Sequence, residues 1–170
     1  MFSLNTPVHV IILMGAAGAG KSTIGRHLAN DLGWRFVDGD DFHPKDNLDK
    51  ISRNLPLTDE DRGPWLERLR AAITGWITTG THVVLASSLL KSAHRTIVLG
   101  HHHPSVRIAY LKADRALLEQ RLLHRTDHVM KADLLDSQLE TLEEPIDALA
   151  LNASDAPSTL VQQIRTALDL

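Results

Sequence analysis

The residues with the clearest chemical meaning form one short run near the start of the chain. The run fits the pattern G-x-x-x-x-G-K-[ST] and consists of Gly15, Ala16, Ala17, Gly18, Ala19, Gly20, Lys21 and Ser22. Glycines at these spacings let backbone N–H groups turn toward phosphate oxygens. The lysine can reach the β- and γ-phosphates, and the serine hydroxyl can ligate Mg²⁺. We therefore predict a mononucleotide site at residues 15–23, including Thr23, rather than an ordinary glycine-rich turn.

A second group of polar residues follows the next apolar stretch. Four aspartates stand within residues 38–46, directly after the predicted strand 34–37. In parallel α/β sheets ligands bind beyond the carboxyl ends of the strands, so Asp38 is expected near Ser22. We predict that Ser22 and Asp38 hold Mg²⁺, directly or through water, and that Asp40 orients a hydroxyl acceptor and takes its proton. The alternative is a solvated turn rich in Asp and Gly.

Positive charge to balance phosphate is concentrated in one later stretch, RLLHRTDHVMK, at residues 121–131. Arg121 and Arg125 are four residues apart and share one face of a helix. The polar, irregular residues that follow suit a flap that closes over a nucleotide, and we predict a lid at about 122–136. A solvated basic helix face is the alternative.

Strand and helix patterns indicate a parallel α/β fold. Apolar runs rich in β-branched residues predict strands at 8–14, 34–37, 81–86, 106–111 and 148–151. Helical spacing of apolar residues predicts helices at 22–32, 64–79, 92–99, 115–124, 132–142 and 158–168. The alternation predicts a three-layer α/β/α P-loop fold with a central parallel sheet of about five strands and a small helical lid.

Three local signals mark helix ends. Gly33 is predicted to cap the carboxyl end of the first helix. Thr58 and Asp61 have the spacing of a capping box before the long helix, and Pro64 suits its first turn.

Length and composition limit the remaining possibilities. The 170 residues predict a single domain over 1–170. The net charge of −3 provides no excess of positive charge for binding nucleic acid or an anionic membrane. Cysteine is absent, which excludes disulfides and a thiol nucleophile. The apolar run Val10–Met14 is too short to span a bilayer, and a signal peptide is not expected, because no charged n-region and small-residue cleavage site accompany the run. We therefore expect a cytoplasmic protein.

A longer stretch resembles a known family. Residues 38–66 read DGDDFHPKDNLDKISRNLPLTDEDRGPWL. This is similar to D-G-D-x-x-H-P-x-x-N-x-x-K-M … P-L-x-D-x-D-R-x-P-W-L of the gluconokinases, small P-loop kinases related to shikimate kinase. ASSLLKSAHR at 86–95 and HVMKADLLDSQLETLEEP at 128–145 are similar to two further segments of that family. The resemblance covers nearly the whole chain, from residue 11 to about 151.

The chain departs from the family pattern at a few positions, none of them in the phosphate-binding run. The substitutions relative to the usual residue are Ile51 for Met, Asn54 for Gly, Ser87 for Cys, His94 for Tyr, Thr96 for Asp and Lys131 for Pro. Asn suits a left-handed backbone position better than most residues, so Asn54 is expected to adopt one.

The resemblance implies a function. A gluconokinase transfers phosphate from ATP, with Mg²⁺, to the terminal hydroxyl of D-gluconate and yields 6-phospho-D-gluconate. It implies that Lys21, Asp40 and Arg125 are catalytic, with either Arg121 or Arg125 on the transferring phosphate. Residues 38–66 would form most of the acceptor site. The residues implied to bind substrate are Asp40, His43, Arg62, Lys91, Arg95 and His128. The resemblance also suggests a homodimer.

Two alternatives remain open from the sequence. One is a related kinase for another small polyol acid, such as shikimate, although the HPKDN and DEDRGPWL stretches favour gluconate. The other is a nucleotide-binding regulatory module without catalysis, which the substitutions at Ser87, His94 and Thr96 keep possible.

Overall fold

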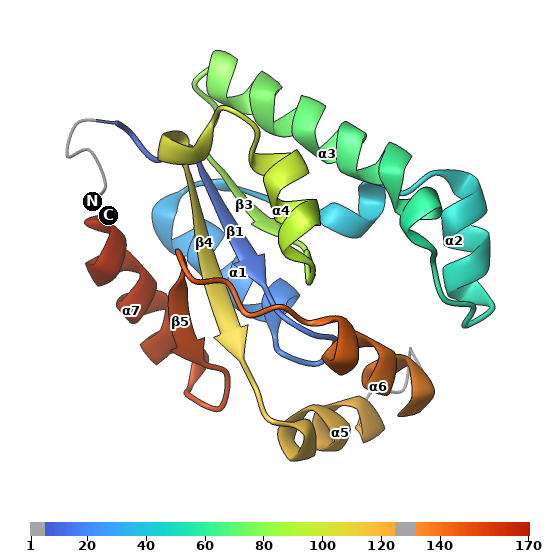
Figure 1. Ribbon diagram of the computed structural model, residues 1–170. Coiled ribbons are helices and arrows are strands. Elements are labelled where there is room, and N and C mark those ends of the chain that lie inside the picture. The colour runs from blue at the N-terminus through green and yellow to red at the C-terminus, as the bar shows by residue number, and fades with distance from the viewer. Residues whose placement is uncertain (1–5, 125–131) are drawn as a thin grey trace.

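The computed structural model describes residues 6–124 and 132–170, and Figure 1 shows the arrangement of their helices and strands. The strands are β1 (Val10–Met14), β2 (Arg35–Asp38), β3 (Val83–Ala86), β4 (Val106–Lys112) and β5 (Leu149–Asn152). The α-helices are α1 (Lys21–Leu32), α2 (Lys45–Ser52), α3 (Asp59–Thr78), α4 (Ser92–Leu99), α5 (Arg115–Leu123), α6 (Ala132–Thr141) and α7 (Pro157–Leu168). Short 3₁₀ turns occur at η1 (Gly39–Phe42) and η2 (His103–Ser105).

The five strands form one parallel sheet in the order β2-β3-β1-β4-β5. Strand β1 lies in the middle, with Ile12 opposite Leu85 of β3 on one side and Ile108 of β4 on the other. The chain builds the β3 side first and then crosses to the β4 side. Because all strands run in the same direction, the segments that follow β1, β2 and β3 meet at one edge, where such folds bind ligands.

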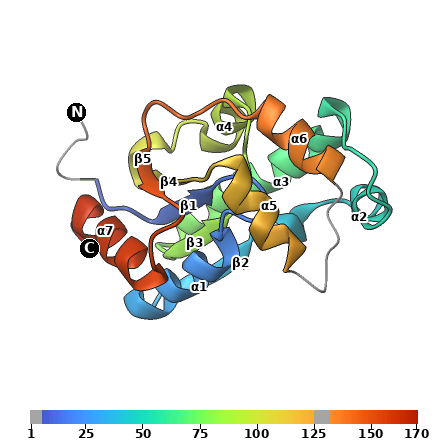
Figure 2. The same ribbon diagram turned by 90° about the horizontal axis from the view of Figure 1, so that it is seen from below.

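Helices cover both faces of the sheet, as Figure 2 shows. Successive side chains of a strand point to opposite faces, so Ile11 and Leu13 pack with α1 and α7, whereas Val10 and Ile12 pack with α3 and α4. The predicted three-layer α/β/α fold with a five-stranded parallel sheet is confirmed. Within the described residues, no helix has the length and apolar composition needed to cross a membrane.

The long helix α3 starts earlier than predicted. It begins at Asp59, and Pro64 lies inside it rather than in the first turn. The predicted capping box is present: the Asp61 N–H donates to Thr58 Oγ1 (3.1 Å) and the Thr58 N–H donates to Asp61 Oδ2 (2.9 Å). This cap sets the start of the helix. Proline is tolerated here because it removes only one helical hydrogen bond, near the solvent-exposed Glu60.

Helix α2 was not predicted from the sequence. It lies away from the sheet, beside the start of α3 (Figure 1). Leu48 and Ile51 remain 44% and 43% exposed, and the buried residue of this helix is the polar Asn47. At eight residues the helix carries only two apolar side chains, Leu48 and Ile51, which is too few for a periodic pattern to be recognised in the sequence.

Candidate active site

A cavity of about 940 Å³ opens at the carboxyl edge of the sheet. Its walls come from the loop after β1, the end of β2, the segment from α2 to the start of α3, the loop after β3, and α6. The polar and charged side chains that line it include Lys21, Ser22, Asp38, Asp40, His43, Asp59, Arg62, Ser87, Lys91, His94 and Gln138. Most residues predicted to act together from the sequence therefore face one space.

The loop between β1 and α1 has the backbone that its glycines allow. Gly20 has a φ of 100° and directly precedes α1. A Cβ atom on Gly15 would lie 2.9 Å from the Leu111 carbonyl oxygen, so a larger residue would push the loop away from β4. The first turn of α1 carries no acidic residue, which leaves the positive end of its dipole available to an anion.

Two side chains from later helices hold this loop in place. Arg121 Nη1 donates to the Gly18 and Ala19 carbonyls (3.2 and 3.1 Å), and its Nη2 donates to the Ala153 carbonyl (2.6 Å). From α6, Gln138 Oε1 accepts a hydrogen bond from the Ala17 N–H (2.8 Å). These contacts give Arg121 a positioning role on the phosphate loop, and direct contact of Arg121 with a nucleotide stays a prediction.

The two aspartates that follow β2 have different surroundings. Asp38 Oδ1 accepts the Asp40 N–H (2.9 Å) and so caps the η1 turn. The Asp40 side chain is 71% exposed and lines the cavity. Desolvation in the cavity raises the pKa of Asp40, and repulsion from the Asp38 carboxylate raises it further. The Lys21 ammonium opposes this shift. The Lys21 charge is thus close enough to be felt at Asp40.

The residues predicted to hold Mg²⁺ fit that ion in kind. Ser22 and Asp38 both line the cavity, and their oxygen atoms are the hard ligands that Mg²⁺ prefers. No group of three or more His, Cys, Asp or Glu side chains gathers anywhere in the described part of the chain. A Mg²⁺ ion here would therefore take its other ligands from phosphate oxygens and water.

His43 is held in a tight aromatic and polar environment. It is 7% exposed and its ring stacks on Trp65, with centroids 4.5 Å apart and planes 14° from parallel. Trp65 Nε1 donates in turn to the Gly39 carbonyl (2.8 Å). Burial, and then the Arg62 charge, lower the pKa of His43 to about 4. The ring is therefore neutral at physiological pH.

This neutral His43 predicts a loss of stability on acidification. The unfolded chain binds a proton at His43 below the usual pKa of 6.5, whereas the folded protein does so only near 4. The free energy of unfolding should thus fall as the pH drops from 6.5 to 4, by about 3 kcal/mol from this group. Urea unfolding of the His43→Gln variant should show a flatter slope over that window. The exposed His101→Gln control should keep the wild-type slope, and equal slopes for His43→Gln and wild type would contradict the prediction.

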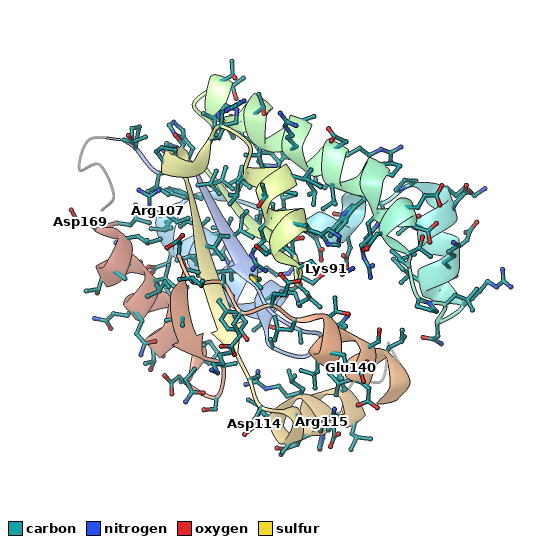
Figure 3. The ribbon with its side chains drawn as sticks, in the orientation of Figure 1. Lys91, Arg107, Asp114, Arg115, Glu140 and Asp169 are labelled. Atoms are coloured by element: carbon teal, nitrogen blue, oxygen red, sulfur yellow. The ribbon has the colours of Figure 1, made fainter. Side chains whose placement is uncertain are left out.

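A cluster formed by Asp59, Arg62, Lys91 and His94 also lines the cavity. Asp59 accepts hydrogen bonds from Lys91 Nζ at both carboxylate oxygens (2.8 Å each) and lies 3.3 Å from His94 Nε2 and 3.8 Å from Arg62 Nη1. Figure 3 shows Lys91 at the start of α4, near the centre of the molecule. Hydrogen bonding to Lys91 lowers the pKa of Asp59. Burial and Arg62 lower the pKa of His94, which Asp59 only partly offsets.

Arg95 is placed differently from Arg62 and Lys91. It is 7% exposed, and its Nη1 donates to the carbonyls of Leu89 (2.9 Å) and Leu90 (3.0 Å). Leu89 has a positive φ of 38°, and these hydrogen bonds hold the loop after β3 in that conformation. Arg95 is not among the residues that line the cavity, so its direct binding of substrate stays a prediction whereas its bracing of the loop is observed.

The predicted lid at about 122–136 lies only partly within the described residues. Arg125 and His128 lie outside the described residues. Helix α6, which completes the predicted lid region, contributes Leu134, Ser137, Gln138 and Thr141 to the cavity wall. Arg115 at the start of α5, labelled in Figure 3, pairs with Asp136 of α6. Helices α5 and α6, which flank residues 125–131, are therefore linked to each other.

Five of the six departures from the family pattern lie within the described residues, and three of them have a clear structural setting. Asn54 has a φ of 54°, as predicted for a left-handed position. His94 is buried and pairs with Asp59. The Ser87 hydroxyl is buried and has no hydrogen-bond partner among the described residues, a situation that a cysteine thiol tolerates better because it is less polar.

A glycine-rich loop that joins the central strand of such a sheet to a helix defines a P-loop nucleotide-binding protein. Comparison with known proteins agrees: the family model described as AAA domain matches residues 10–146. A probable gluconokinase of Xenopus tropicalis is 37% identical, over 94% of this chain and 93% of that protein. The thermoresistant gluconokinase of Escherichia coli is also 37% identical, over 85% and 82%. The chain belongs to the gluconokinase family.

Solved structures agree with this placement. A gluconokinase from Sinorhizobium meliloti superposes with a TM-score of 0.84 at 33% identity, covering 97% of this chain and 94% of that one. A shikimate kinase from Bacteroides thetaiotaomicron has a TM-score of 0.69 at 18% identity over 95% and 99%, which shows a shared fold alone.

Several polar residues of the site were not predicted as site residues from the sequence. Among them are Asp59, His94 and Gln138, which line the cavity, and the buried Asn47, which contacts His43. Asn47 and Asp59 stand at fixed positions of the family pattern quoted above, and that was the available signal for them. Gln138 carries no such signal, because its role depends on α6 meeting the phosphate loop.

Proposed function

We propose that this protein transfers the γ-phosphoryl group of ATP to the terminal hydroxyl of D-gluconate, yielding ADP and 6-phospho-D-gluconate. The observation that carries the proposal is that one cavity joins the phosphate loop to a cluster of charged side chains that includes Asp59, Arg62 and Lys91. The 37% identical relatives named gluconokinases support the choice of acceptor.

The net charge of the cluster around Asp59 suits a substrate with one carboxylate. Arg62 and Lys91 carry two positive charges, Asp59 carries one negative charge, and His94 is neutral because its pKa is lowered. The cluster therefore has one positive charge in excess. An arginine fork and a lysine ammonium can both bind a carboxylate, which would fix the end of gluconate that does not react.

At the reacting end of the cavity, different groups of the protein would bind the phosphates and the substrate hydroxyl. Backbone N–H groups of the loop and Lys21 would hold the β- and γ-phosphates. Mg²⁺, held by Ser22 and Asp38, would neutralise phosphate charge when bound. The substrate hydroxyl would donate a hydrogen bond to Asp40 as its oxygen attacks the γ-phosphorus, the bond to ADP breaks, and the proton passes to Asp40. Because this kind of transition state is loose, Asp40 acts mainly by orienting the hydroxyl.

Further properties belong to the same proposal. We expect ATP with Mg²⁺ as the phosphate source, Arg125 on the transferring phosphate, and His128 at the substrate. A homodimer is expected from the resemblance to the gluconokinases, and a cytoplasmic location is expected from the sequence alone.

Identification of the product tests the proposal. After incubation with ATP, Mg²⁺ and D-gluconate, ³¹P NMR should show a phosphate monoester coupled to the terminal methylene group, in amounts equal to the ADP formed. ATP consumption that yields only inorganic phosphate, or no consumption at all, would overturn the assignment. ATP binding without any transfer would favour the regulatory module instead.

A further inference from the structure

The ring of His43 is oriented by a second buried polar residue, Asn47. Asn47 is 3% exposed and lies on α2, one helical turn after His43. Its side-chain Nδ2 is 2.8 Å from the backbone carbonyl oxygen of Asp61 and 3.2 Å from His43 Nδ1. Asp61 is itself fixed at the start of α3 by the capping box and by Lys50 (2.7 and 2.9 Å).

These two contacts determine where the ring carries its hydrogen. A backbone carbonyl can only accept a hydrogen bond, so the Asn47 atom that faces it is the NH₂ group. The second hydrogen of that group is then available to His43 Nδ1, which must accept it. An imidazole that accepts at Nδ1 is neutral and carries its hydrogen on Nε2. The low pKa of His43 agrees with the neutral form.

The hydrogen on Nε2 is directed at the reacting end of the cavity. His43 Nε2 lies 3.9 Å from Asp40 Oδ1. An oxygen placed about 2.8 Å from both atoms forms an angle of about 90° between them, which is acceptable for two hydrogen bonds. A hydroxyl suits this place because it donates to the Asp40 carboxylate and accepts from Nε2–H. With the other tautomer, Nε2 and the carboxylate would both be acceptors, and the hydroxyl would satisfy only one of them.

We propose that Asn47 is a positioning residue that holds His43 in its Nε2–H tautomer, so that His43 and Asp40 bind the reacting hydroxyl as donor and acceptor. The tautomer belongs to the protein alone, while its effect on turnover rests on the proposed function. The arrangement selects an alcohol as acceptor, since a carbonyl or ether oxygen has no hydrogen to donate to Asp40.

The tautomer can be measured without any substrate. Long-range ¹H–¹⁵N correlation spectra of the full-length protein labelled in its histidines distinguish a protonated from an unprotonated ring nitrogen, and the His43→Gln variant assigns the signal. At neutral pH we expect His43 to carry hydrogen on Nε2 only. A hydrogen on Nδ1 in the wild-type protein would overturn the proposal, whatever the behaviour of the variants.

The Asn47→Asp variant tests the consequence. A carboxylate cannot donate to Nδ1, and it favours a hydrogen there instead. We expect the His43 signals to change and kcat with D-gluconate to fall about 10- to 100-fold, with little change in the KM for ATP. The matched control is Asn30→Asp at the exposed Asn30 of α1, which should behave like wild type.

A double-mutant comparison separates positioning from mere structural damage. If Asn47 acts through His43, Asn47→Asp should add little to the loss of kcat already caused by His43→Leu. Losses that multiply would contradict the mechanism. If the wild type shows the Nε2–H tautomer but no turnover with gluconate, the proposed function fails and the tautomer assignment stands. Should Asn47→Asp not fold, the wild-type spectrum still decides the tautomer.

Discussion

Replacing Asp40 by Asn is expected to lower kcat with D-gluconate by about 100-fold or more while leaving ATP affinity nearly unchanged. Asp40 lines the cavity with a largely exposed side chain, and its Oδ1 lies 3.9 Å from His43 Nε2. An amide keeps the size of the side chain but cannot take the proton of the attacking hydroxyl. Steady-state kinetics and a separate titration with a non-hydrolysable ATP analogue measure the two effects.

The neighbouring carboxylate provides the matched control for this variant. Asp41 is exposed and does not line the cavity, so Asp41→Asn should keep wild-type turnover. Strongly weakened ATP binding together with normal turnover in Asp40→Asn would refute the role assigned to Asp40.

Replacing Lys21 by Ala is expected to damage nucleotide binding and transfer together. Lys21 Nζ donates to the Ala16 carbonyl (3.0 Å) and faces the cavity at the start of α1. Loss of a cation that contacts the transferring phosphate should lower kcat by about 100- to 1000-fold, with weaker ATP binding as well. The measurement is a titration with ATP and a turnover assay on the same preparation.

Two checks make the Lys21 result interpretable. Circular dichroism should show that the Lys21→Ala variant is folded, since the hydrogen bond to Ala16 also shapes the loop. Lys45→Ala, which removes an exposed lysine at the start of α2, should have no comparable effect. An unchanged kcat in folded Lys21→Ala would contradict the assignment of the loop.

Local patterns in the sequence predicted the features that depend on neighbouring residues. The phosphate loop, the Thr58–Asp61 capping box and the left-handed Asn54 involve residues close together in the chain. The alternation of buried strands and amphipathic helices was sufficient for the three-layer fold, because every strand pairs only in the parallel sense.

Several features that were missed depend on contacts between distant segments. Lys91 and Asp59 are 32 positions apart, and Gln138 reaches a loop 121 positions away. A sequence also identifies an arginine without giving the direction of its guanidinium. Arg95 and Arg121 were predicted to face ligands, yet in the structure they donate to backbone carbonyls that shape the cavity.

The central claim is that this cavity phosphorylates D-gluconate in preference to other acceptors. A coupled assay of ADP release with D-gluconate, shikimate, glycerate and nucleoside monophosphates, each with ATP and Mg²⁺, tests it most directly. We expect turnover that depends on gluconate and clearly exceeds that with every other acceptor. Gluconate-dependent turnover no higher than that with the other acceptors would contradict it.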